Sequence, residues 1–243
     1  MLSYVPMQNP LATLLYPSAC LLCRQHVPAF VNGLCHDCER AATPVLPPRC
    51  EQCGLSLPGA YDARPRCRRC QAQSLAFDRA LSPFQYFGVV RDAVHAFKYH
   101  GHERIGRWLA AHMAELARSE FSLMAAPVVV PVPMHWLKQR VRGLNPCALL
   151  AEQIASTLTL SCDRNMLERS LWMPSQTRLT RRQRFTNARA AFRVARRRPV
   201  PATVLLVDDV MTSGATAHAC AQALRACGAE RVSVLTAARA ELP

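Results

Sequence analysis

The sequence predicts an α/β protein with a mostly parallel sheet and a small metal-binding module at its N-terminal side. Two observations predict this class. From about residue 76, short apolar runs alternate with stretches of helical periodicity, the pattern of a parallel sheet covered by helices on both faces. Before that point, eight cysteines form four Cys-x-x-Cys pairs, the spacing of metal-binding turns. We expect the metal module over 15–75 and the α/β domain over 76–243.

Length, composition and charge exclude several classes of protein. The 243 residues are 50% hydrophobic and 19% charged, which excludes a disordered chain, a collagen and a coiled coil as the main character. The net charge of +14 comes from 28 Arg and 2 Lys against 16 acidic residues. Apolar runs are far shorter than the roughly 18 residues of a membrane span, and the N-terminus lacks the basic region of a signal peptide. We expect no transmembrane segment and a cytoplasmic protein.

The cysteine pairs predict two structural zinc sites with four sulfur ligands each. In a reducing compartment, clustered cysteines are metal ligands more often than disulfides, although a disulfide scaffold is the alternative. Two Cys-x-x-Cys turns complete one tetrahedral site and leave no coordination position open for catalysis. The simplest pairing of the turns is sequential, and spacing alone leaves a cross-braced pairing open. The eight expected ligands are Cys20, Cys23, Cys35, Cys38, Cys50, Cys53, Cys67 and Cys70.

The elements of the α/β domain follow from two kinds of pattern. Apolar residues recur at helical spacing in four stretches, which are 91–99, 105–117, 148–158 and 217–226. Strands are expected at one extended stretch interrupted by proline and at three continuous apolar runs, which are 80–88, 128–132, 204–207 and 232–236. The continuous runs predict strands that are buried on both faces.

Residues 204–216, with the sequence VLLVDDVMTSGAT, predict a phosphate-binding turn preceded by two acids. Asp208 and Asp209 follow the apolar run at the carboxyl edge of the sheet, where open α/β sheets bind ligands. The turn into the next helix offers backbone N–H groups, hydroxyls and a positive helix end to a phosphomonoester, and Gly214 permits close approach of the backbone. Two carboxylates beside an anion site indicate a ligand that also carries hydroxyls, such as a ribose diol. The turn residues are Thr212, Ser213, Gly214, Ala215 and Thr216.

This segment resembles the ribose-5-phosphate signature of type I phosphoribosyltransferases over thirteen residues. The resemblance implies that Asp208 and Asp209 contact the ribose 2′ and 3′ hydroxyls and that the turn holds the 5′-phosphate. The ligand would then be phosphoribosyl pyrophosphate or a nucleotide, bound with Mg²⁺. The 6-oxopurine enzymes of that superfamily place their general base where this chain has Thr212, which disfavours purine salvage of that type.

The layout of the whole chain, from about residue 15 to 240, resembles the ComF/ComFC competence proteins, which include the GntX-like DNA-utilisation proteins. That family joins N-terminal zinc ribbons to a type I phosphoribosyltransferase-like domain. Its Phe-Lys-Tyr segment matches 97–99, its Pro-Val-Pro segment matches 131–133, and its Gln…Arg…Asn…Phe string matches 176–192. Leu144 stands where the family has an aromatic residue, and Pro146 replaces a polar residue at a helix start, where proline is tolerated.

The resemblance implies further residues around the ligand. The turn after the first buried run lies where the superfamily keeps its pyrophosphate loop. The additional residues expected to contact the ligand are Lys98, Pro133, Met134, His135, Arg140, Arg142 and Arg184. The four cysteines outside the module, by contrast, are expected as small buried fillers; they are Cys147, Cys162, Cys220 and Cys227.

Residues 164–198, called the arginine belt here, contain eleven arginines and one acid, and thus ten of the fourteen net positive charges. Arginine contacts phosphates and stacks on bases, so the belt favours single-stranded DNA, with an affinity that falls steeply with salt. A solvated loop and a belt that neutralises pyrophosphate are the alternatives. Trp172 is the better candidate for stacking, whereas Phe185 and Phe192 are expected in the core.

The resemblance implies a cytoplasmic competence or DNA-utilisation protein that handles internalised single-stranded DNA. Its partners would be single-stranded DNA, phosphoribosyl pyrophosphate or a nucleotide, and proteins of the DNA-uptake machinery. Two alternatives stay open from the sequence. The chain could be an active phosphoribosyltransferase that acts on a base or an amine, or a zinc-ribbon adaptor whose catalytic fold is a relic.

Overall fold

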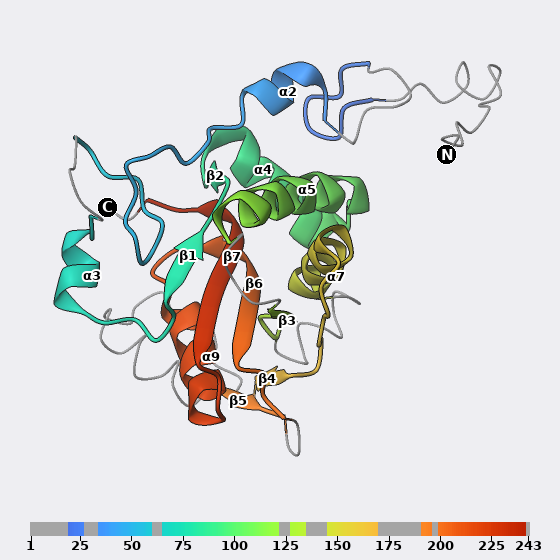
Figure 1. Cartoon of the computed structure of the whole chain (residues 1–243). Coiled ribbons are helices and arrows are strands. Elements are labelled where there is room, and N and C mark those ends of the chain that lie inside the picture. The colour runs from blue at the N-terminus through green and yellow to red at the C-terminus, as the bar shows by residue number, and fades with distance from the viewer. Residues whose placement is uncertain are drawn as a thin grey trace.

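The fold is built on a five-stranded sheet whose described strand pairs are all parallel, as the sequence predicts (Figure 1). In this computed structural model the strand order is β1-β7-β6-β3, and β2 pairs with β7 beyond β1. The strands are β1 (Arg79–Leu81), β2 (Phe84–Gln85), β3 (Val128–Pro131), β6 (Thr203–Met211) and β7 (Arg231–Arg239). The structure describes residues 19–26, 34–59, 65–121, 127–134, 145–169, 191–195 and 199–241.

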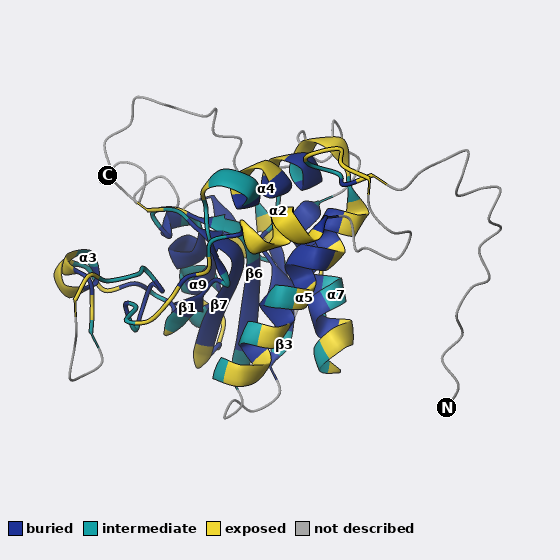
Figure 2. Cartoon of the chain, turned by 90° about the horizontal axis from the view of Figure 1, so that it is seen from above, coloured by how far each residue is buried: buried dark blue, intermediate teal, exposed yellow. Residues whose placement is uncertain are grey.

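Both faces of this sheet are buried under helices. Alternate residues of a strand point to opposite faces; in β6, Leu205 and Val207 join a core with α4, α5 and α7, whereas Val204 and Leu206 join a second core with α9. These helices are α4 (Gly88–His100), α5 (Glu103–Glu120), α7 (Pro146–Leu158) and α9 (Ala215–Ala226). Figure 2 shows the strands in the buried colour and exposed residues on the outer faces of α4, α5 and α7. Helices on both faces of a parallel sheet confirm the predicted α/β class. The continuous apolar runs predicted it because a strand covered on both sides has apolar residues on both faces.

Strand β6 is longer than the sequence predicts. The apolar run predicts a strand over 204–207, with the two acids after it, but pairing with β7 continues to the partners Met211 and Arg239. Asp208 and Asp209 therefore lie inside the strand rather than beyond its end. Asp208 stands opposite Thr236 of β7 in the register. Val210 is opposite Ala238, so Asp209 lies between two paired residues of the strand.

The start of α7 lies close to the end of β3. Asn145 is the N-cap of α7: its side-chain oxygen accepts a hydrogen bond from the Cys147 amide at 3.1 Å, and its side-chain nitrogen donates to the Val132 carbonyl at 3.1 Å. Pro146 occupies the first turn, where its missing N–H costs nothing. The expected tolerance of proline at this position is confirmed. One asparagine thus joins the helix start to the carboxyl end of a sheet strand.

The remaining described elements are short. They are the helices α2 (His36–Arg40) and α3 (Arg68–Ala72) and the antiparallel pair of β4 (Leu167–Arg169) with β5 (Phe192–Val194). In Figure 1, α2 lies beside α4 and α3 lies on the other side of β1. None of the described helices combines the length and the apolar character that crossing a membrane requires.

Candidate functional site

Four side chains from three elements meet at the carboxyl-terminal half of β6. Lys98 of α4 places its Nζ atom 2.7 Å from Asp209 Oδ1. Cys147, in the first turn of α7, donates its thiol hydrogen to Asp208 Oδ1 over 3.3 Å, and the Asp209 amide donates to the same oxygen over 2.9 Å. The fold thus gathers Lys98 and both acids, which the sequence singled out, and adds Cys147, which the sequence indicated only as a filler.

The electrostatics of this cluster keep its charge close to balance. Burial raises the pKa of Asp208 to about 7, and the negative charge of Asp209 adds to the rise. Burial alone would lower the pKa of Lys98, but the Asp209 carboxylate outweighs it, and the pKa of Lys98 is raised. Burial also raises the pKa of the Cys147 thiol well above its usual value, so this thiol is a hydrogen-bond donor at neutral pH. Asp209 therefore has a fixed cation beside it, whereas Asp208 can gain or lose a proton near pH 7.

The turn after β6 has a backbone that only glycine adopts easily. Gly214 is the N-cap of α9 with φ of +71°, and a Cβ atom built on it would lie 2.7 Å from the Met211 Cε atom. The Ser213 hydroxyl accepts a hydrogen bond from the Ala215 amide at 3.3 Å. The first turn of α9, which is fully described, carries no acidic side chain. Its positive end is therefore not neutralised from within the helix.

A hollow of about 20 Å³ connects the turn to Asp208. This is roughly the room that one water molecule needs, so a sugar phosphate would occupy the rim of the hollow rather than its interior. The lining residues come from β6, β7 and the start of α9; they are Asp208, Val210, Met211, Thr212, Gly214, Ala215, Thr216, Ala217 and Thr236.

The eight predicted cysteine ligands form two separate groups, and their pairing is sequential. The ligand atoms within each group all lie within 4.8 Å of one another, in the sets Cys20/Cys23/Cys35/Cys38 and Cys50/Cys53/Cys67/Cys70. The third cysteine of each set donates its backbone N–H to the first sulfur over 3.3 Å in both groups, which supports a thiolate there. Four sulfurs at this spacing fit a tetrahedral Zn²⁺ ion. Two structural zinc ions suit the two sites, and the sequential alternative is confirmed over the cross-braced one.

The two cysteine groups pack against different parts of the α/β region. The first shares a core with α4 and α5, and Glu39 of α2 accepts a hydrogen bond from Trp108 Nε1 of α5 at 2.9 Å. The second shares a core with the α9 face of the sheet, and the Gln52 carbonyl accepts from the Ala80 amide of β1 at 2.8 Å. All four cysteines of the second group are buried, whereas Cys23 of the first is exposed. The second site is the more closely joined to the sheet.

Several predicted residues lie outside the described part of the chain. Pro133 and Met134 are described and half-buried after β3. Within the arginine belt, Phe192 is buried in the core as expected, with the Arg169 guanidinium 5.3 Å from the centre of its ring. The predicted residues outside the description are His135, Arg140, Arg142, Trp172, Arg184 and Phe185.

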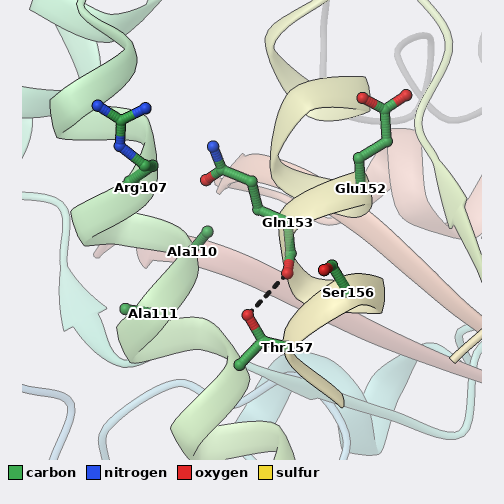
Figure 3. A pocket seen from close by; sticks show the side chains of 7 residues that line it. All are labelled: Arg107, Ala110, Ala111, Glu152, Gln153, Ser156 and Thr157. Atoms are coloured by element: carbon green, nitrogen blue, oxygen red, sulfur yellow. Dashed lines mark hydrogen bonds between the residues drawn. The ribbon is translucent and has the colours of Figure 1, made fainter. Parts of the chain in front are cut away.

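A larger groove of about 470 Å³ lies between α5 and α7 (Figure 3). Its two charged lining residues have partners elsewhere: Arg107 pairs with Glu103 at 3.9 Å, and Glu152 pairs with Arg164 at 2.7 Å. The dashed line in Figure 3 is the bond from the Thr157 hydroxyl to a backbone carbonyl of its own helix. Neither acid of β6 nor any residue of the turn lines this groove. The candidate site therefore stays at the end of β6.

Comparison with known proteins shows which family the chain belongs to. A family model described as a double zinc ribbon domain matches residues 11–72. The chain is 29% identical over 226 residues to "Competence protein F" of Haemophilus influenzae, covering 91% of this chain and 96% of that protein. It is 31% identical over 222 residues to "DNA utilization protein YhgH" of Salmonella typhimurium, covering 90% and 95%. The chain belongs to the ComF competence-protein family. The resemblance inferred from the motifs is confirmed.

Solved structures similar to this ComF-family protein are more distant. One is described as the allosteric regulatory enzyme of purine biosynthesis, with TM-score 0.37 and 19% identity over 54% of this chain and 26% of that one. Another is the glutamine phosphoribosylpyrophosphate amidotransferase from B. subtilis complexed with ADP and GMP, with TM-score 0.39 and 17% identity over 58% and 30%. Both scores are low, so the ligands of those proteins say nothing about this one.

Proposed function

We propose that this ComF-family protein handles single-stranded DNA and that the end of β6 binds a pentose phosphate, either phosphoribosyl pyrophosphate or the 5′-phosphate end of a nucleotide. The observation that carries the proposal is the adjacency of two carboxylates to a glycine-initiated helix with no acid in its first turn. A helix end of this kind favours an anion, while carboxylates accept hydrogen bonds from sugar hydroxyls. A sugar that carries both a phosphate and a diol can bind the helix end and the carboxylates at the same time.

In the proposed complex each side chain has a defined task. The phosphate accepts hydrogen bonds from the first-turn amides of α9 and from the hydroxyls of Thr212 and Thr216. The ribose diol donates to Asp208 and Asp209, which the pairing of β6 with β7 holds in place. Lys98 balances the charge of Asp209, and the Cys147 thiol orients Asp208 by its hydrogen bond. Mg²⁺, which takes oxygen ligands, would be held by the two carboxylates together with the ligand phosphates.

Calorimetric titration tests the binding site. We expect phosphoribosyl pyrophosphate with Mg²⁺ to bind wild-type protein and to bind Asp208→Asn and Asp209→Asn at least about tenfold more weakly, since each loses a charged acceptor. Asp92→Asn is the matched control, because Asp92 is an exposed acid on α4 that pairs with its neighbour Arg91. Equal binding by all three variants and wild type would remove the proposed role of the acids.

The proposal for DNA is supported by the arginine belt and by the names of the relatives. A segment with ten net positive charges in 35 residues attracts phosphates, and its affinity for them falls as salt increases. We expect a labelled single strand to bind, and substitution of Arg181, Arg182 and Arg184 by Ala to weaken binding and flatten its salt dependence in fluorescence anisotropy. The control is Arg118→Ala, an exposed arginine of α5 paired with Glu115. Unchanged affinity in the triple variant would contradict the role of the belt.

A second candidate function is phosphoribosyl transfer itself. Asp208, with a pKa of about 7 beside the proposed ribose, can accept or donate a proton near neutral pH. Enzyme activity would release pyrophosphate when phosphoribosyl pyrophosphate is supplied with an acceptor base or amine. Binding without pyrophosphate release, across a panel of acceptors, would favour the DNA-handling role alone.

A further inference from the structure

Arg239, the last residue of β7, lies between the second cysteine group and the turn after β6. The residue is 2% exposed. On one side its Nε atom donates to the Cys53 carbonyl at 3.0 Å, and Nη2 lies 3.7 Å from the Cys53 sulfur. On the other side Nη1 donates to the carbonyls of Met211, Thr212 and Ala240 at 2.9, 2.6 and 2.7 Å. One guanidinium therefore contacts a metal ligand and the turn at the same time.

With zinc bound, the second cysteine group would balance the charge of Arg239. A buried cation is costly unless an opposite charge lies close to it, and among the described residues no carboxylate forms an ion pair with Arg239. Four thiolates around one Zn²⁺ ion carry a net charge of about −2. With zinc bound, the second cysteine group would supply the negative charge that no described carboxylate offers to Arg239. The contact with Cys53 would then be an electrostatic pairing between the zinc site and β7.

The carbonyls that Arg239 holds belong to the proposed phosphate-binding turn. Met211 and Thr212 directly precede Ser213 and Gly214, and the Met211 carbonyl also accepts from the Ala240 amide at 2.9 Å. The Met211 side chain also packs against Gly214, since a Cβ atom built there would lie 2.7 Å from the Met211 Cε atom. Movement of these two carbonyls would therefore displace the amides and hydroxyls that follow them.

We propose that Arg239 is a positioning residue that couples zinc at the Cys50/Cys53/Cys67/Cys70 site to the shape of the turn 212–216. With zinc bound, the guanidinium stays paired with Cys53 and fixes the carbonyls of Met211 and Thr212. Without zinc, the guanidinium loses its counter-charge and the turn loses its anchor. The part of this inference that concerns ligand affinity rests on the proposed pentose-phosphate site, whereas the part that concerns the turn does not.

The test compares Arg239→Met, which removes the charge, with Arg239→Lys, which keeps the charge but not the forked donors. The control is Arg225→Met, since Arg225 also binds two backbone carbonyls and an acid, at the far end of α9. Three measurements are made on the full-length protein: zinc content, hydrogen exchange of the amides of 212–217, and affinity for phosphoribosyl pyrophosphate. We expect exchange of 212–217 to rise at least about tenfold and affinity to fall by a similar factor in Arg239→Met. For both exchange and affinity, Arg239→Lys should give values between those of wild type and Arg239→Met, and Arg225→Met should match wild type.

A second pair of variants removes each zinc ion in turn. Cys53→Ser should speed exchange of 212–217, whereas Cys23→Ser, in the first group, should leave it unchanged. Unchanged exchange of 212–217 in folded Arg239→Met or in Cys53→Ser overturns the coupling. If the variants change exchange as expected but wild-type protein does not bind phosphoribosyl pyrophosphate, the coupling holds and the proposed ligand is wrong.

Discussion

The Nζ atom of Lys98 lies 2.7 Å from the Asp209 carboxylate, and this ion pair joins α4 to β6 at the centre of the candidate site. Both side chains are largely buried, with 21% and 15% of their surface exposed. An ion pair in such a position is screened less by solvent than a surface pair. It therefore sets both the charge of the site and part of the stability of the fold.

Replacing Lys98 by Met removes the cation and keeps the aliphatic stem. Asp209 then lacks a partner and Asp208 loses a charge that lowers its pKa, so we expect the free energy of unfolding to fall by about 1–3 kcal/mol in urea titration. The matched control is Arg118→Met, which breaks the exposed pair with Glu115 and should change stability by less than about 1 kcal/mol. Equal stability of Lys98→Met and wild type would show that the pair is not electrostatically coupled to the fold.

The raised pKa of Asp208 makes stability depend on pH in a defined direction. The pKa rises from 3.8 to about 7 on folding, so between these values the folded chain holds a proton that the unfolded chain releases. The free energy of unfolding from this group therefore falls as pH increases from about 4 to about 7 and is level above that range. Asp208→Asn cannot titrate. We expect the wild-type free energy of unfolding, minus that of the variant, to decline across this range; a flat difference would contradict the shift.

Local spacing explains which features the sequence predicts well. A Cys-x-x-Cys turn is defined within four residues, and the two acids and the glycine turn after them lie in one stretch of thirteen, so both can be located without knowing the fold, while phosphate binding by the turn stays a prediction. The length of β6 could not be read in this way, because it depends on pairing with β7. The four apolar residues marked only the fully buried part of the strand.

The roles of two residues near the site could not be predicted from the sequence, because their partners are distant along the chain. Cys147 reaches an acid 61 positions away, and Arg239 reaches Cys53 across 186 positions. The one available signal for Cys147 is its place two residues after Asn145 at a helix start. For Arg239 it is a charge that directly follows a buried strand pattern. Neither signal names a partner, since contacts of this kind exist only once the strands are paired.

Each zinc ion should contribute separately to stability. We expect metal analysis to give two zinc ions per chain and one in either Cys53→Ser or Cys23→Ser. The loss in melting temperature should be larger for Cys53→Ser, because its group is fully buried and shares a core with the sheet, while Cys23 is exposed. A chelator should lower the melting temperature of wild type as well, since zinc binding contributes folding energy. Equal losses in melting temperature in the two variants would contradict the conclusion that the second site packs more closely against the sheet than the first.

Gly214→Ala should separate the shape of the turn from the stability of the helix that follows. The variant forces a side chain into a left-handed backbone, at a cost of about 1–2 kcal/mol, and places it 2.7 Å from Met211 Cε, so the turn or the flexible Met211 side chain must shift. Gly228→Ala is the control, because Gly228 has φ of +109° at the other end of α9 and nothing within 4 Å of a new Cβ atom. Both variants should lose stability in urea titration, but only Gly214→Ala should weaken binding of phosphoribosyl pyrophosphate, by at least about tenfold. Equal binding by the two variants would mean that the turn does not contact the phosphate.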